Sequence, residues 1–177
     1  MERSLLRQFQ REVERQCNFA MIALQDMEEA SANSDGKLFW YSVQGLLVSV
    51  ERVSLTLWPT DPHYPERGAA LRQSLDVGDA SPLKDRVFLD RFARFDEQIE
   101  EWYAASEHRR FFDSYTEPLD VLAETTPGDR LRGYDMEKNA LLLHQEVYYL
   151  DPVSHAIEEI QQRAEAETQK PRFDRKI

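Results

Sequence analysis

Hydrophobic residues recur at spacings of three and four along most of this chain, which is the pattern of the buried face of an α-helix. The spacing predicts long helices over about 2–32, 37–58 and 83–105, a shorter one at about 66–75, and a last helix over 151–167. The period is most regular in 83–105, where the apolar residues follow one another at spacings of four, three, four and three: Phe88, Phe92, Phe95, Ile99 and Trp102. The pattern therefore predicts a mainly α protein, arranged as an up-and-down helical bundle.

The second of these helices is apolar on much of its circumference, because Trp40 and Leu47 lie opposite its main stripe. A helix that is hydrophobic on several sides is usually surrounded by others, so we expect it at the centre of the bundle. Three prolines after Trp58 end this helix. The residues expected in the core are those on the apolar stripes, notably Phe39, Leu46, Val50, Phe92, Phe95, Ile99 and Trp102.

The pattern changes after Ser106. The segment 106–130 shows no sustained period, whereas 131–150 alternates apolar and polar residues as a β-strand does. A turn at 137–139 divides this region into a hairpin. An isolated hairpin is marginally stable in water, so it should lie on the helices. We expect one domain over 1–167, with the hairpin at about 131–150, and a basic tail over 168–177.

Composition narrows the function classes. The 177 residues suit one domain, and the formal charge of −11 repels nucleic acid unless a local basic patch or a partner supplies the contact. A single cysteine, Cys17, excludes an internal disulfide. The longest apolar run falls well short of a membrane span, and the first residues turn polar too early for a signal peptide. We therefore expect a cytoplasmic protein without membrane contact.

The residues that most often carry chemistry form no recognisable site. The four histidines show no metal-ligand spacing, so we expect neither a metal nor a cofactor. Cys17 is interpreted as core packing. The densest acidic cluster, which includes Glu97, is interpreted as a solvated helix face beside an Asp90–Arg94 ion pair. The aromatic stripes could line a ligand pocket, but they are more often core.

Several segments in order along the chain resemble uncharacterised bacterial proteins of the HEPN-like family. The strongest match is 92–100, Phe-Ala-Arg-Phe-Asp-Glu-Gln-Ile-Glu, which is similar to a family stretch with the pattern Arg-Asn-x-x-x-His-Phe-Asp-Glu-Arg. The remaining segments that carry the resemblance are 39–44, 57–59, 67–69, 81–86, 110–114 and 149–152. The resemblance implies a helical bundle that is commonly dimeric. Many members are metal-independent RNA endonucleases of toxin–antitoxin and phage-defence systems.

The family site consists of an arginine, a polar residue and a histidine, and the residues of two subunits meet across the dimer. Carried over to this sequence, the arginine falls on Leu89, the polar residue on Asp90 and the histidine on Arg94. The imidazole that would transfer a proton is therefore missing. The resemblance implies that Asp90, Arg94 and Glu97 face a second subunit.

Three hypotheses follow. The one we favour is a non-catalytic HEPN-like subunit that binds protein, either as a homodimer or with another partner, in a bacterial defence or toxin–antitoxin assembly. A second is a plain structural domain. The third is a ribonuclease or nucleotide-handling enzyme with a rearranged site, built from Arg86, Asp90, Arg91, Arg94 and His108.

Overall fold

The computed structural model describes residues 1–61, 63–107, 109–116 and 125–171. Within these residues it contains six α-helices and a small three-stranded antiparallel sheet that precedes the last helix. The predicted fold class, mainly α with a small C-terminal β element, is confirmed. The chain divides into two compact units, 1–84 with 154–177, and 85–153. The prediction of a single domain over 1–167 stays a prediction.

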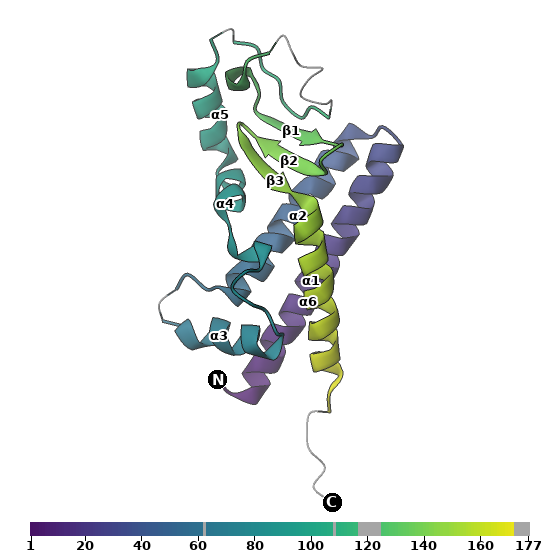
Figure 1. The fold of residues 1–177 in the computed structure, drawn as a ribbon, viewed down its shortest axis with the longest axis vertical. Helices are drawn as coiled ribbons and strands as arrows, with labels where there is room; N and C mark the ends of the chain where they lie inside the picture. The colour runs from purple at the N-terminus through teal and green to yellow at the C-terminus, as the bar shows by residue number, and fades with distance from the viewer. Residues whose placement is uncertain (62, 108, 117–124, 172–177) are drawn as a thin grey trace, which may run out of the picture. The chain divides into compact units, whose positions relative to one another are not determined.

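The first unit is built on two long antiparallel helices, α1 (Arg3–Ala32) and α2 (Gly36–Leu57), which lie side by side in Figure 1. A tight turn joins them, and the Asp35 side chain caps α2 by accepting a hydrogen bond from the backbone N–H of Leu38 at 3.0 Å. Small side chains between the helices, such as Ala20 and Ala23, let the two backbones approach closely. The buried stripe of α2 includes Phe39, Leu46 and Val50, as predicted.

Two further helices complete this unit. α3 (Pro65–Ser74) follows the proline-rich loop, and η1 (Pro82–Lys84) is a single 3₁₀ turn. The last helix, α6 (Leu150–Gln169), buries Ile157, Ile160 and Ala164. Its C-terminal part is bonded to the unit, since Thr168 Oγ1 donates to the Glu14 carboxylate at 2.7 Å and Arg163 Nη1 donates to the backbone oxygen of Asp76 at 2.6 Å.

The second unit holds two short helices, α4 (Val87–Ala93) and α5 (Phe95–Ala105), and the 3₁₀ turn η2 (Pro127–Asp129). Its sheet has the order β1 (Arg132–Asp135), β2 (Ala140–Leu143), β3 (Glu146–Tyr149). The central strand β2 is buried throughout, which explains its uninterrupted apolar run.

The prediction of one continuous helix over 83–105 is wrong. The backbone leaves the helical region at Arg94, with φ −106° and ψ 50°, so this residue ends α4 and starts α5. The break changes which face of α5 is buried: Gln98 and Trp102 point into the unit, whereas Ile99 is 43% exposed. Ile99 is therefore not a core residue, and Phe92 and Phe95 are only half-buried.

The predicted hairpin over 131–150 is present, and a third strand extends it. His144 adopts a left-handed conformation, φ 52°, and turns the chain between β2 and β3. Three strands result where two were predicted, and the extra pairing joins Leu142 to Val147 and Leu143 to Glu146. Residues 144–149 therefore form a turn and the third strand, β3, and do not continue β2.

Candidate protein-interaction site

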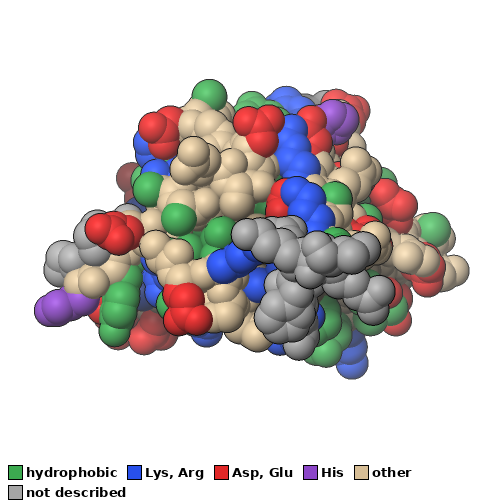
Figure 2. Space-filling model, turned by 90° about the horizontal axis from the view of Figure 1, so that it is seen from below, with side chains coloured by type: hydrophobic (Ala, Val, Ile, Leu, Met, Phe, Trp, Pro, Cys, Tyr) green, Lys and Arg blue, Asp and Glu red, His purple; other side chains and the backbone are tan. Residues whose placement is uncertain are grey.

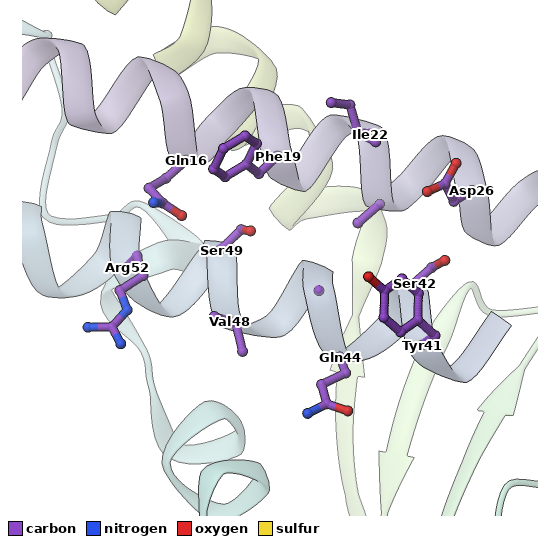
Figure 3. A pocket seen from close by; sticks show the side chains of 12 residues that line it. Gln16, Phe19, Ile22, Asp26, Tyr41, Ser42, Gln44, Val48, Ser49 and Arg52 are labelled. Atoms are coloured by element: carbon purple, nitrogen blue, oxygen red, sulfur yellow. The ribbon is translucent and has the colours of Figure 1, made fainter. Parts of the chain in front are cut away.

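An open groove with a volume of ≈ 620 Å³ runs between α1 and α2 in the first unit. Figure 3 shows Phe19 and Ile22 on the α1 side, and Tyr41 and Val48 on the α2 side. These four apolar side chains are 48–74% exposed, and Tyr41 is the most exposed of them. A contiguous apolar area on a soluble protein, rimmed by polar groups, commonly marks a protein interface. The groove is therefore the leading candidate for a binding site.

The charged groups of the groove lie at its two ends. Asp26 lies at the end near the α1–α2 turn, whereas Arg52 lies at the opposite end, as Figure 3 shows. Neither side chain forms an ion pair or a side-chain hydrogen bond with any other described residue. Gln16 and Gln44 add uncharged amides to the rim. The groove thus has an apolar centre and one free charge of each sign at its ends.

The floor of the groove contains Gly45, an exposed glycine in the middle of α2. A glycine inside a helix lowers its stability by about 1 kcal/mol relative to alanine. Nothing among the described residues requires it, because a Cβ at this position would meet only the Ala23 Cβ, at an ordinary 3.8 Å. An exposed helical glycine with room for a side chain suits the close approach of another molecule.

The residues predicted from the sequence, Asp90, Arg94 and Glu97, lie together on the second unit, at the junction of α4 and α5. Arg94 is exposed and pairs with Glu97 at 3.2 Å. Its Nε donates to the backbone oxygen of Asp90 at 3.2 Å, so the predicted ion pair between the Asp90 and Arg94 side chains is replaced by this contact and by the pair with Glu97. Both partners are about half exposed, which makes the pair worth little to stability.

Two of the arginines proposed for a rearranged catalytic site are paired with carboxylates. Arg91 is held between Glu146 at 3.2 Å and Glu101 at 3.4 Å, and Arg94 is paired with Glu97. These guanidinium groups are thus neutralised by neighbouring carboxylates. His108 lies outside the described residues, as do residues 172–177 of the predicted basic tail.

Charges of both signs also mix on the surface. On the face drawn in Figure 2, Lys and Arg side chains lie beside Asp and Glu side chains. Within the described residues, no group of three or more His, Cys, Asp or Glu side chains is placed to hold a metal ion. In the same part of the chain, no helix has the length and apolar character that crossing a bilayer requires.

His144 has a structural role in the second unit. Its Nε2 lies 3.2 Å from the backbone oxygen of Gln98, linking the β2–β3 turn to α5. Burial lowers the pKa of His144, and the nearby Arg91 adds to this effect, while the Gln98 carbonyl and Glu101 oppose it. The imidazole is therefore neutral at pH 7 and acts as a hydrogen-bonded link.

This lowered pKa predicts an acid-sensitive unit. The unfolded chain binds a proton at His144 near the ordinary pKa of about 6.5, before the folded chain does, so stability is full above that pH and is lost as pH falls through the lower folded pKa. Urea unfolding followed by circular dichroism at pH 7.5 and 5.5 should show the loss in the wild type. The loss of stability between the two pH values should be smaller in His144→Gln than in the wild type. In His155→Gln, where the replaced histidine is exposed, it should equal the loss in the wild type. Equal losses in all three proteins would contradict this role.

A second cavity, of ≈ 640 Å³, lies where the start of α1 meets the start of α3. Its lining includes Phe9, Tyr64 and Arg67. The Arg67 guanidinium already lies over both rings, 5.2 Å from the centroid of Phe9 and 5.7 Å from that of Tyr64. These cation–π contacts stabilise the packing of Arg67 against the two rings, so the arginine has a structural role in this cavity.

The sequence did not single out the groove. Its signal was present, since Phe19 and Ile22 are apolar but fall outside the main stripe of α1, and α2 is apolar on several sides. No protein-family model matches the chain, and neither curated proteins nor solved structures give a significant match. The resemblance to HEPN-like proteins stays a prediction.

Proposed function

We propose that this chain is a non-catalytic protein-interaction subunit that binds its partner through the groove between α1 and α2. The observation that carries the proposal is the set of four exposed apolar side chains, Phe19, Ile22, Tyr41 and Val48, gathered along one groove of an otherwise strongly charged chain. Burying such side chains would favour association by roughly 25 cal/mol per Å². The resemblance to HEPN-like proteins would place the subunit in a bacterial defence or toxin–antitoxin assembly.

Two observations favour binding over catalysis. The position of the family arginine is occupied by Leu89, which is buried with only 2% exposure. The position of the family histidine is occupied by Arg94, an exposed residue whose guanidinium pairs with Glu97. A buried leucine and a paired arginine supply no group that can take or give a proton near pH 7.

This reasoning predicts that the purified chain does not cleave RNA. The test is incubation with single-stranded and structured RNA in the absence of metal ions, with the products separated on a denaturing gel. The expected result is intact RNA for the wild type and for Arg94→Ala alike. Cleavage by the wild type that disappears in Arg94→Ala would favour a ribonuclease with a rearranged site.

The binding function is tested by affinity purification of the tagged chain from its host cells, comparing Val48→Glu with Val87→Glu. Both valines are on helices and about half exposed, at 48% and 57%, but only Val48 lines the groove. We expect a defined protein, or an untagged copy of the chain, to be recovered with the wild type and Val87→Glu and to be lost with Val48→Glu. Equal recovery of the partner with both variants would show that the groove is not the binding site.

The surface around Asp90, Arg94 and Glu97 stays a predicted second contact. The variant Arg94→Glu places like charges beside Glu97, so it should weaken association if this surface is used. Included in the same purification, it separates the two surfaces: loss with Arg94→Glu alone would assign binding to the α4–α5 junction.

A further inference from the structure

We propose that the partner seated in the α1–α2 groove is a second copy of this chain, packed antiparallel across a two-fold axis. The inference names the partner of the site described under the proposed function, and it rests on that function. It is carried by the arrangement of charges in the groove, by the exposed glycine in its floor, and by the length of the two helices.

The charges select the orientation. Two copies packed face to face can be related by an axis that lies in the interface, either along the helices or across them. An axis along the helices keeps the two copies parallel. It would bring the two Asp26 side chains to one end of the interface and the two Arg52 side chains to the other, so that like charges meet. An axis across the helices reverses the direction of the second copy and brings each Asp26 to the end that holds Arg52 of the other. Only this antiparallel arrangement matches unlike charges, and it does so twice.

The same symmetry gives the other groups at the ends partners of suitable chemistry. It brings Tyr41 of the second copy over Arg52, where the guanidinium can lie against the phenol ring. Asp26 of the second copy is brought over Gln16, whose amide nitrogen already donates to Glu12 at 2.8 Å and has a second hydrogen for this carboxylate. The Arg52 side chain forms no ion pair or hydrogen bond with any other described residue, so its guanidinium is available to this neighbour.

At the centre of the groove the symmetry explains Gly45. In the antiparallel arrangement, Val48 of the second copy lies over Gly45, because the two positions are nearly equidistant from the middle of the groove. The exposed valine of each copy then fills the gap that the glycine of the other leaves. The stability that a helical glycine costs the isolated chain is thereby offset by closer packing of the pair.

The dimensions fit a reversible dimer. The middle of the groove coincides with the middle of α2, a helix of 22 residues. Packing over its whole length, about 33 Å, and over the width of two helices, about 20 Å, would cover roughly 650 Å² on each copy. This is slightly less than the roughly 800 Å² per partner of a standard interface, so we expect a dissociation constant in the micromolar range.

The test is a charge exchange measured by sedimentation velocity of the purified full-length chain between about 1 and 500 µM. The variants are Asp26→Arg, Arg52→Asp and the double exchange. Each single variant faces like charges across the axis, so self-association should weaken at least about tenfold, and the double variant should recover to near the wild-type value. Circular dichroism controls for folding, which surface changes of this kind usually leave intact.

A geometric readout complements this test. Oxidation of a Gln16→Cys/Asp26→Cys double variant should give a disulfide-linked dimer, because this symmetry places Asp26 of one copy over Gln16 of the other, whereas Asp26→Cys alone should not. Cys17 does not interfere, because it is buried and burial raises the pKa of its thiol to about 12.

The outcomes distinguish this inference from the proposed function. The wild type could stay monomeric to 500 µM and yet bind a different host protein, with that binding lost in Val48→Glu. This result would overturn self-association through the groove and leave the groove as a binding site for another protein. A double exchange as weak as the single variants would overturn the antiparallel pairing. Groove variants that alter neither self-association nor recovery from the host would overturn both.

Discussion

Replacing Asp129 with alanine should lower the free energy of unfolding by about 3 kcal/mol. This carboxylate is completely buried in the second unit. Its Oδ1 accepts a hydrogen bond from Ser106 Oγ at 2.6 Å, and its Oδ2 accepts from Thr126 at two atoms, the backbone N at 3.1 Å and Oγ1 at 2.9 Å. Alanine would leave the buried Ser106 hydroxyl and the two half-buried donors of Thr126 without these bonds, and an unmade bond to a buried group costs about 1–3 kcal/mol.

The matched control is Asp129→Asn. The amide oxygen can take the two bonds from Thr126, and the amide nitrogen can donate to Ser106 Oγ, which is also an acceptor. We expect the asparagine variant to lose less than half of what the alanine variant loses in urea unfolding. Equal losses would show that the negative charge, and not the hydrogen-bond geometry, is what this site requires.

Asp129 also shows what the sequence could not reveal. Its partner Ser106 is distant in the chain and follows the end of α5. Trp102 of α5 donates through Nε1 to the backbone oxygen of Asp129 at 3.1 Å. These residues lie at the two edges of a segment in which no period is visible. The isolated bridge between Phe112 and Arg130 has the same character, since it joins two stretches of irregular chain. Periodicity reports which face of an element is buried, but not which loop meets it.

The helices were predicted where their period was long and their ends were marked. The bounds of α1 and α2 were predicted to within a residue or so, because a polar turn and a run of prolines flank them. The break at Arg94 was missed for the opposite reason: the aromatic spacing continues through it, and no proline or glycine marks it. Phe88 of α4 stacks on Tyr148 of β3, with ring centroids 4.9 Å apart, and this contact aligns α4 with the sheet. A contact between residues so distant in the chain cannot be predicted from the spacing of apolar residues.

The groove could be predicted from the sequence only in part. Apolar residues outside the main stripe of a helix are visible in a sequence, but the sequence does not show whether a neighbouring element covers them. In the structure Val53 and Leu57 of α2 are fully buried, whereas Val48 of the same helix is 48% exposed. Only the placement of the other helices distinguishes the two, so a binding surface of this kind becomes apparent only from the three-dimensional structure.

A comparison of two helical glycines gives the second large expected effect. Gly68 lies in α3, where a Cβ would come within 2.6 Å of both the backbone oxygen of Leu57 and the Cδ of Pro59. The first of these atoms belongs to the end of α2 and also accepts a hydrogen bond from Arg72 Nη1 at 2.6 Å. Gly68→Ala must therefore push α3 away from the end of α2 or break this bond, and overpacking of this kind typically costs 1–3 kcal/mol.

The Gly45→Ala variant is the matched control, because it makes the same substitution in a helix with room for the added methyl group. At a protein concentration well below the micromolar dissociation constant inferred above, where association is negligible, we expect Gly45→Ala to raise the free energy of unfolding by up to about 1 kcal/mol. Gly68→Ala should instead lower it by about 2 kcal/mol, despite the same gain in helix propensity. Urea unfolding of the two variants beside the wild type measures both changes. A stabilised Gly68→Ala would show that α3 and the end of α2 are not packed as closely as the structure places them, and would remove the steric reason for a glycine at this position.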